Sequence, residues 1–286
     1  MNLMPRFKLT IEYAGTRYSG WQIQKNARTV QGEIDRAVRA VTDRTDFELY
    51  GSGRTDAGVH ALAQVAHLDV IVANLPAEAL RRRLNDELPA DINVLAVAPV
   101  PHKFHARHDA VARRYLYQIS KRRTALAKPF VWWVKESIDV TRMREAASLF
   151  VGMRDFQSFA ASDGPRRSRS EEAESAARDE GRSPGQTEAS TLVLVDRIEV
   201  VEEGALVLVG IEGSHFLWKM VRRVVGVLAE IGRGGLDPSA ATTFLASPSA
   251  VPAQLTAPAS GLFLERVYYH GDARRTRLTA ATPLGA

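Results

Sequence analysis

The chain has 286 residues, of which 45% are hydrophobic and 25% are charged, an ordinary composition for a soluble globular protein. It contains no cysteine, which excludes disulfides and thiolate metal sites and favours an intracellular location. The net charge is +5, which suits a polyanionic partner, although many basic proteins bind no nucleic acid.

The first half of the chain carries strand and helix patterns in alternation. It begins without a signal-peptide pattern, and no apolar run is long enough to span a bilayer, so we expect a cytoplasmic protein without a membrane segment. Residues 6–13 alternate strictly between polar and apolar, which predicts a half-buried strand. A helix is expected after Thr29, which suits the N-cap position. The other expected elements of this half are strands at 47–52, 63–70 and 92–100 and a helix at 75–89.

The second half repeats the same order of elements without evident sequence identity to the first. Its expected elements are strands at 113–120, 191–201, 205–213 and 261–269 and helices at 140–152 and 216–232. Each half therefore follows the ferredoxin-like order β-α-β-β-α-β. We predict an α+β fold of two such subdomains, at 5–106 and 107–270, with a cleft between them that could hold a ligand.

Two segments lack the patterns of a packed element. Residues 162–190 contain no large apolar side chain, so we predict a disordered surface loop there. A helix over residues 170–180 is possible, but it would have no apolar face. The tail at 271–286 is expected to be loose, and its arginines could contact RNA or simply be solvated.

The most distinctive short stretch is "GRTDAGVH", which begins at Gly53 and lies between two predicted strands. Its glycines permit backbone conformations that other residues resist. Asp56 is explained by turn chemistry alone, because aspartate is common in turns. Arg54 adds another interpretation, since an arginine two residues away can bind phosphate or favour an ionised carboxylate. The residues alone leave both interpretations of Asp56 open.

Several stretches together resemble the tRNA pseudouridine synthase A family, in the right order over about residues 6–270. They are "IEYAGTRYSGWQIQKNARTVQGEID", "GRTDAGVHA", "FHARHDAVARRYLY", "FLWKMVRRVVG" and "APASGLFLERVYY". The resemblance implies one continuous mixed sheet with a central active-site cleft. It also implies a homodimeric isomerase that needs no cofactor or metal and converts uridines at positions 38, 39 and 40 of the tRNA anticodon arm to pseudouridine.

The resemblance also implies roles for individual residues. Asp56 matches the catalytic aspartate, and Arg222 matches the basic residue that pairs with it and supports the active site. Tyr115 matches the tyrosine that stacks on the target base, although from the residues alone a core tyrosine is favoured. The matched tRNA contacts are Arg54, assigned to base extrusion, together with Arg107 and Arg123, each of which could equally be a solvated arginine.

Two departures from the family pattern are visible in the sequence. Trp218 and Lys219 stand where the common bacterial form has paired histidines. The polar segment 162–190 replaces a shorter one that carries an Arg-Thr pair. The precise RNA contacts at these two places are therefore not carried over from the family.

Two other functions compete with catalysis on RNA. The spacing of His102, His105 and His108 suggests a metal site, but no cysteine or glutamate completes a ligand set, so we expect no metal. A non-catalytic RNA-binding protein of the same fold would keep a basic cleft and would not need Asp56. The aromatic signature of RNA-recognition modules is absent from both halves.

Overall fold

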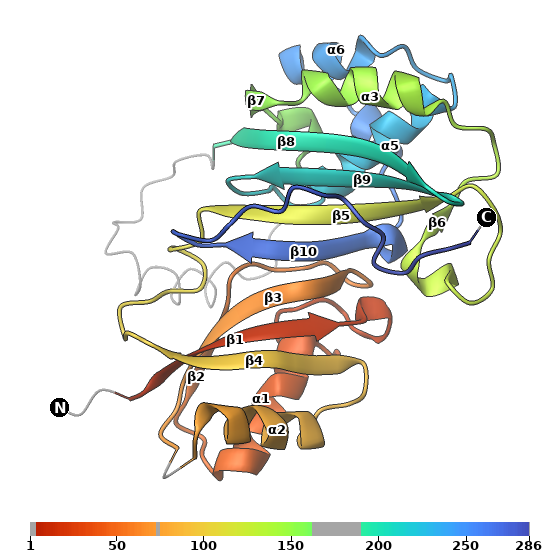
Figure 1. The fold of residues 1–286 in the computed structure, drawn as a ribbon. Helices are drawn as coiled ribbons and strands as arrows, with labels where there is room; N and C mark the ends of the chain where they lie inside the picture. Colours follow the sequence, from red (N-terminus) through yellow and green to blue (C-terminus); the bar gives the residue numbers. More distant parts are fainter. Residues whose placement is uncertain (1–3, 73–74, 162–189, 286) are drawn as a thin grey trace.

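A single ten-stranded sheet runs through the molecule, in the order β4-β1-β3-β10-β5-β9-β8-β7, with β2 paired to β3 and β6 to β5 (Figure 1). The computed structural model describes residues 4–72, 75–161 and 190–285. Its strands are β1 Arg6–Tyr13, β2 Glu48–Gly51, β3 His60–Asp69, β4 Ile92–Val100, β5 Ala112–Ser120, β6 Trp132–Trp133, β7 Gly152–Asp155, β8 Leu192–Glu203, β9 Leu206–Gly213 and β10 Leu262–Tyr268. Its α-helices are α1 Val30–Thr42, α2 Ala77–Glu87, α3 Val140–Leu149, α5 Met220–Gly232, α6 Ala240–Ala246 and α7 Val251–Gln254.

The two halves of the chain build the same motif. The N-terminal half gives the strand order β4-β1-β3-β2, and the C-terminal half gives β10-β5-β9-β8, so the last, first, third and second strands of each half lie side by side. The seam between the halves is a short parallel pairing of β10 with β3, in which Phe263 lies opposite His60. The other main pairings are antiparallel. The predicted α+β class, with two ferredoxin-like halves in one mixed sheet, is confirmed.

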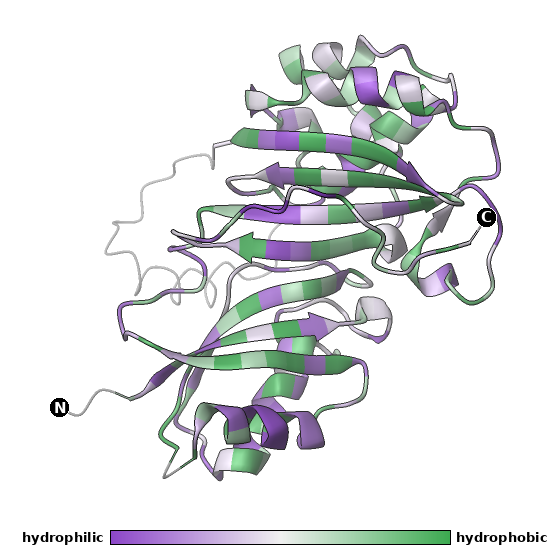
Figure 2. Cartoon of the chain, in the orientation of Figure 1, coloured by the Kyte–Doolittle hydropathy of each residue, from purple (hydrophilic) through white to green (hydrophobic). Residues whose placement is uncertain are grey.

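The local patterns explain why these elements form. β1 covers the predicted residues, and its alternate side chains are buried. Figure 2 colours the residues by hydropathy, and polar and apolar residues follow one another along the strands. Thr29 caps α1, because its hydroxyl accepts a hydrogen bond from the Gly32 N–H at 3.2 Å. Ile34 and Val38 then face the N-terminal core, which α1 and α2 share with β1 and β3. Helix α2 packs on α1 and on β4.

The C-terminal half has a core on each face of the sheet. On one face, α3 and α5 pack against side chains of β5, β8 and β9. Among the described helices α5 has the most buried residues, ten of its thirteen. On the other face, Leu116, Leu208 and Phe263 form a smaller cluster with Leu278 from the C-terminal tail.

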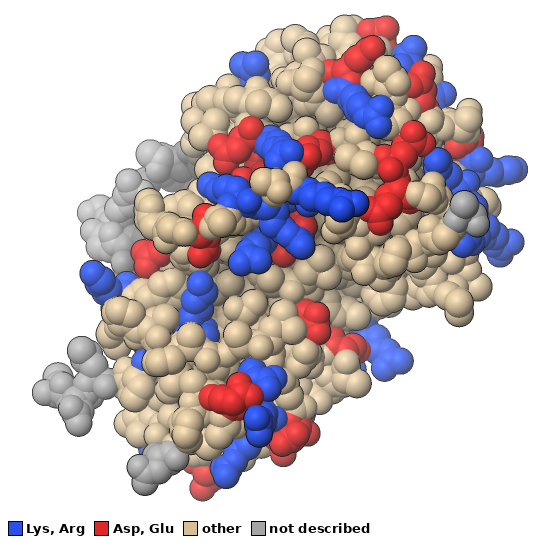
Figure 3. Space-filling model, in the orientation of Figure 1, with Lys and Arg blue, Asp and Glu red and all other residues tan. Residues whose placement is uncertain are grey.

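The C-terminal tail, which was predicted to be loose, is packed against the sheet. Its path crosses the face of β5 and β9 that lies opposite α5 (Figure 1). Leu278 is only 4% exposed, and the Ala281 N–H donates to the side-chain oxygen of Gln118 at 2.8 Å. Arg274 and Arg275 pair with buried carboxylates of the sheet, and Figure 3 shows basic side chains gathered among acidic ones on this face. One apolar anchor and paired charges therefore order a segment whose sequence has no periodicity.

The sequence patterns did not indicate four short elements, which are strands β6 and β7 and helices α6 and α7. The predicted loop at 162–190 lies outside the described residues apart from Ser190. The boundary predicted after residue 106 falls in the connection between β4 and β5. Within the described ranges, no helix combines the length and apolar character that crossing a membrane requires.

Candidate active site

The loop between β2 and β3 carries Asp56 and is held from both sides. Thr55 is buried; its carbonyl accepts from the Trp21 N–H at 3.1 Å, and its hydroxyl lies 2.8 Å from the hydroxyl of Tyr13. On the other side, the Gly58 N–H donates to the carbonyl of Tyr18 at 3.3 Å. Gly58 has φ +77°, a conformation that an L-residue with a side chain rarely adopts. The backbone around Asp56 is therefore fixed by the N-terminal half.

The Asp56 side chain points to the C-terminal half. Its Oδ1 accepts from the indole N–H of Trp218 at 3.0 Å, and its Oδ2 accepts from a guanidinium N–H of Arg222 at 3.3 Å. The side chains of Asp56 and Arg222 are 24% and 16% exposed. An aspartate that only capped its own turn would accept from neighbouring backbone N–H groups. The carboxylate instead connects its own loop to Trp218 and to Arg222 in α5, which are more than 160 positions away in the sequence.

Arg222 is itself anchored by backbone. Its Nε donates to the carbonyl of Ala257 at 2.7 Å, and its own carbonyl accepts from the Ala257 N–H at 3.0 Å. The segment around Ala257 can approach α5 closely because residue 226 is glycine. A Cβ there would lie 1.7 Å from the carbonyl oxygen of Leu255. The structure thus brings Arg222, which the family resemblance pairs with the aspartate, to the Asp56 carboxylate.

The start of α5 differs from the sequence prediction. The predicted helix began at Phe216, whereas α5 begins at Met220 and residues before it form a turn. Lys219 has φ 60° and ψ 2°, which is left-handed backbone that few non-glycine residues adopt. This residue interrupts the helix and separates Trp218 from the helical register. The apolar spacing alone could not show the interruption, because the tertiary contact with Asp56 lies outside any local pattern.

Tyr115 on β5 lies beside this group. It is half-buried and its ring packs edge-on against Phe216, with ring centroids 5.2 Å apart. Burial raises the pKa of Tyr115 to about 12; the nearby Arg113 opposes the shift and the negative charge of Asp56 adds to it. The phenol is therefore neutral at physiological pH. Tyr117, by contrast, is fully buried and its hydroxyl donates to the carbonyl of Pro258 at 2.7 Å, as expected of a core residue.

Sequence reasoning did not single out Arg113, which connects three segments around the site. Its guanidinium donates to the carbonyls of Ser52 and Arg107 at 3.0 Å and of Ser214 at 2.9 Å. These carbonyls belong to the loop before Asp56, the connection between the two halves and the turn after β9. Burial lowers the pKa of Arg113, with the tyrosines nearby partly offsetting this. The available sequence signal was the pair Arg113 and Arg114. Neighbours on a strand face opposite sides of the sheet, so one of the two had to lie on the same face as Tyr115.

The three arginines predicted to contact tRNA do not all lie in the same part of the structure. Arg54 is exposed in the loop of Asp56. Arg107 is exposed, and its carbonyl is joined to that loop through Arg113. Arg123 lies beyond the end of β5, where its guanidinium carbon is 6.0 Å from the ring centre of Trp133. Arg54 and Arg107 are thus linked to the surroundings of Asp56, whereas the contacts found for Arg123 connect it elsewhere.

The three spaced histidines do not form a ligand set. The rings of His105 and His108 lie 4.2 Å apart, and Nδ1 of His105 accepts from backbone N–H groups of Arg107 and His108. His102 lies 3.7 Å from Asp69. In the part of the chain that the structure describes, no group of three or more histidine, aspartate or glutamate side chains could hold a metal ion.

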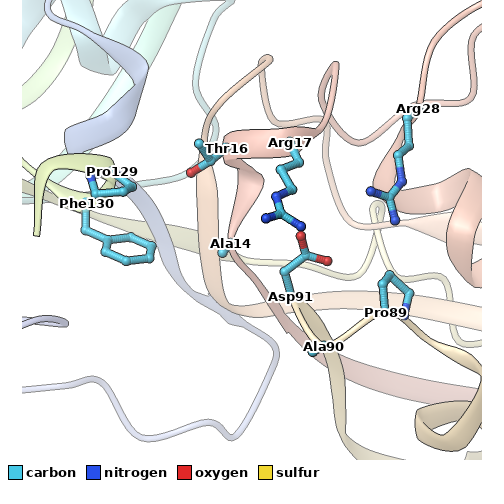
Figure 4. A pocket seen from close by; sticks show the side chains of 9 residues that line it. All are labelled: Ala14, Thr16, Arg17, Arg28, Pro89, Ala90, Asp91, Pro129 and Phe130. Atoms are coloured by element: carbon cyan, nitrogen blue, oxygen red, sulfur yellow. The ribbon is translucent and has the colours of Figure 1, made fainter. Parts of the chain in front are cut away.

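A hollow in the described part of the chain lies away from Asp56. It has a volume of about 480 Å³ and is open to solvent beside residues 15–17. In Figure 4 the side chain of Arg17 points toward Asp91, and Arg28 enters from another segment. The second hollow, of about 220 Å³, also lies away from Asp56. The Asp56 carboxylate is instead partly exposed where groups of the two halves meet.

Comparisons with known proteins agree on one family. A family model described as tRNA pseudouridine synthase matches residues 9–109 and 146–270. The chain is 38% identical to the tRNA pseudouridine synthase A of Rhodopseudomonas palustris, over 93% of this chain and 100% of that protein. It is 37% identical to that of Geobacillus kaustophilus, over 93% and 95%. It is 33% identical to tRNA pseudouridine synthase A 2 of Clostridium tetani, over 92% and 98%.

A comparison with solved structures gives a weak likeness. A chain from the crystal structure of a Cbf5-Nop10-Gar1 complex matches with a TM-score of 0.32 and 12% identity. The match covers 78% of this chain and 45% of that chain. This likeness carries no argument about the site.

Proposed function

The chain belongs to the tRNA pseudouridine synthase A family, and from that premise we propose that it isomerises uridine to pseudouridine in tRNA. The target uridines are those at positions 38, 39 and 40 of the anticodon arm. One observation carries the proposal: the Asp56 carboxylate, in the stretch that matches the family, is held by Arg222 and partly exposed to solvent. This catalytic function is favoured over a non-catalytic RNA-binding role.

The reaction rearranges one bond and needs no change in oxidation state. The bond from ribose C1′ to base N1 breaks, the base turns, and C1′ bonds to C5. The proton on C5 is lost and N1 gains one, so the product is an isomer of the substrate. A carboxylate suits this task, because it can attack the sugar or the base or remove a ribose proton. We assign this role to Asp56, and Arg222 holds its charge and orientation.

A uridine within a stem must leave the stack before its glycosidic bond can be reached. We assign Tyr115 to contact with the extruded base, because its neutral ring lies beside the Asp56 group. Arg54, exposed in the same loop, takes the RNA contact at the vacated position, since a planar guanidinium can stack and bind phosphate. Arg107 and Arg123 contact the RNA further away.

Two further parts of the proposal concern the state of the protein in the cell. We assign it to the cytoplasm, where its tRNA substrate is found. We also assign it a homodimeric state, in which one tRNA contacts both subunits; a two-fold dimer is the commonest symmetric assembly. Sedimentation of the protein with and without tRNA tests this, and a monomer in both conditions would contradict it.

The decisive experiment is to map pseudouridine in tRNA after incubation with the protein. We expect new pseudouridine at positions 38 to 40 with the unchanged protein and none with Asp56→Asn. The matched control is Asp46→Asn, a change at an exposed aspartate that pairs with Arg44, and this variant should retain full activity. Absence of product with the unchanged protein would contradict the proposed function. Product with Asp56→Asn would contradict the role of that residue.

A further inference from the structure

The residue that invites a further assignment is Trp218. It is 45% exposed, which is unusual for a tryptophan, and yet its indole N–H points at one oxygen of the candidate catalytic carboxylate. Neither turn chemistry nor core packing explains both facts, because a solvated indole needs no protein acceptor. The sequence showed Trp218 only as a departure from the common family pattern.

The backbone holds Trp218 in this position. Its carbonyl accepts from the Ala161 N–H at 2.9 Å, and the following residue, Lys219, adopts the left-handed conformation that ends the turn. The ammonium of Lys219 lies 4.7 Å from the centre of the indole ring, a favourable cation–π arrangement. Left-handed backbone at a non-glycine residue costs free energy and is maintained only where the surroundings determine it. These contacts fix the direction of the indole N–H before any substrate binds.

The two donors to Asp56 act on different oxygens. Arg222 contacts Oδ2 and Trp218 contacts Oδ1, so together they restrict rotation of the carboxylate about the bond that carries it. A carboxylate oxygen accepts more than one hydrogen bond, so each oxygen keeps a free lone pair for reaction. With one donor the carboxylate could still turn, and misplacement of a reacting group by about 1 Å can cost roughly a hundredfold in rate.

We propose that Trp218 is a positioning residue for Asp56, and that its indole N–H and Arg222 together fix the orientation of the reactive carboxylate. This inference rests on the proposed function, since orientation matters only if Asp56 reacts. It adds a residue whose role neither the family pattern nor the pairing with Arg222 supplies. Trp218 acts through the N–H group, so a ring without that group cannot replace it.

The first test reads the hydrogen bond directly and requires no activity. The protein has four tryptophans, so ¹⁵N labelling gives up to four indole N–H signals, and Trp218→Phe identifies the one that is lost. In Asp56→Ala that signal should move upfield by more than the other three. An unmoved Trp218 signal would overturn the proposal. This result stands even if the unchanged protein forms no pseudouridine, in which case the proposed function fails separately.

The second test separates positioning from RNA binding. Trp218→Phe keeps an aromatic ring and removes the N–H, whereas Trp218→His places a ring N–H the same number of bonds from Cα. We expect the single-turnover rate of Trp218→Phe to fall roughly ten- to a hundredfold, with the tRNA dissociation constant changed less than about twofold, and Trp218→His to recover part of the rate.

Three outcomes of the second test would overturn the proposal. They are an unchanged rate in Trp218→Phe, equal losses in the two variants, or weakened tRNA binding with an unchanged rate. The last result would assign Trp218 to stacking on RNA. Thermal unfolding of both variants checks that the fold is kept, as expected for a side chain that is nearly half exposed.

Discussion

Arg114 and Glu265 form an ion pair in the middle of the sheet, with 2.7 Å between Nε and Oε2 and both side chains 1% exposed. Arg114 also lies 3.0 Å from Glu199 and 3.6 Å from Glu212. Arg275 from the tail pairs with the second oxygen of Glu265. Arg274 pairs with Glu212, so three arginines meet three glutamates on the face that the tail covers, opposite the face that carries α5.

Replacing Arg114 by methionine should destabilise the protein strongly. The change leaves buried carboxylates without their central partner, and breaking a buried pair in this way costs about 3–5 kcal/mol. Urea unfolding should therefore show a lower midpoint with little change in slope. The matched control is Arg197→Met, in which the lost partner is 44% exposed and the expected loss is below about 1 kcal/mol. Equal effects of the two changes would contradict the role of the buried network.

Leu278 tests whether the tail is part of the folded structure. Its side chain is buried against Leu116, Leu208 and Phe263, so Leu278→Ala should lower the free energy of unfolding by about 2–4 kcal/mol. A loose tail would give no change. Leu126→Ala provides the control, because Leu126 is 93% exposed and its loss should cost less than about 0.5 kcal/mol. Chemical denaturation of the three proteins under one condition makes the comparison.

Even the conservative change Arg222→Lys should lower the catalytic rate. The arginine fork reaches the Asp56 carboxylate and the Ala257 carbonyl together, whereas a lysine ammonium is a point charge that cannot keep this geometry. We expect Arg222→Lys to reduce the single-turnover rate roughly ten- to a hundredfold, and Arg222→Met to reduce it further. Binding of tRNA should change little. Arg233→Lys, at the exposed end of α5, is the control and should keep the full rate.

His60 gives the protein a component of acid sensitivity. Its Nδ1 accepts a hydrogen bond from the Gly15 N–H at 3.0 Å. Protonation of Nδ1 would replace this acceptor by a second N–H donor and break the hydrogen bond. Burial lowers the pKa of His60 below its ordinary value of 6.5, with hydrogen bonds to Pro129 and Ser260 opposing. The unfolded chain therefore takes up this proton first as the pH falls. The contribution of His60 to stability is present above about pH 6.5 and is lost as the pH falls through the folded-state pKa.

The measurement is the free energy of unfolding from about pH 7.5 to pH 5.5. His60→Gln should be less stable than the unchanged protein at the upper pH, and the difference should shrink toward the lower pH. His270→Gln, a change at an exposed histidine, is the control, and at the upper pH it should lower the stability less than His60→Gln does. A constant difference between the unchanged protein and His60→Gln would show that the histidine contributes by packing alone.

The sequence predicted the long elements well because their signals are local. β1 follows from strict alternation and α1 from its apolar stripe and the Thr29 cap. The predicted start of α5 was wrong, because the apolar spacing continues through Trp218 whereas the backbone at Lys219 is left-handed. The tail was also wrong, because one leucine and a few arginines give no periodic pattern. Their partners lie on strands far away in the sequence.

In the candidate site, too, the contacts that the sequence did not reveal are those between residues far apart in the chain. Asp56 and Arg222 were selected by resemblance to a family, not by spacing. Their hydrogen bond joins residues that are 166 positions apart, and no local pattern reports such a contact. Arg113 was missed for the same reason, since its acceptors are backbone carbonyls from three segments. The site depends on how the two similar halves pack against each other. The secondary-structure propensity of a segment gives no information about that packing.

The position of β10 has a consequence for synthesis. Among the described strands β10 comes last in the sequence, yet it lies between β3 and β5 and forms the seam between the halves. A ribosome releases the chain from its N-terminus, and domains fold as they emerge. Until residues 262–268 are available, β3 and β5 have open edges at the seam, and such edges invite pairing with other chains. Products truncated before β10 should thus be substrates for chaperones and proteases, and the two halves cannot meet at the seam before residues 262–268 have been made.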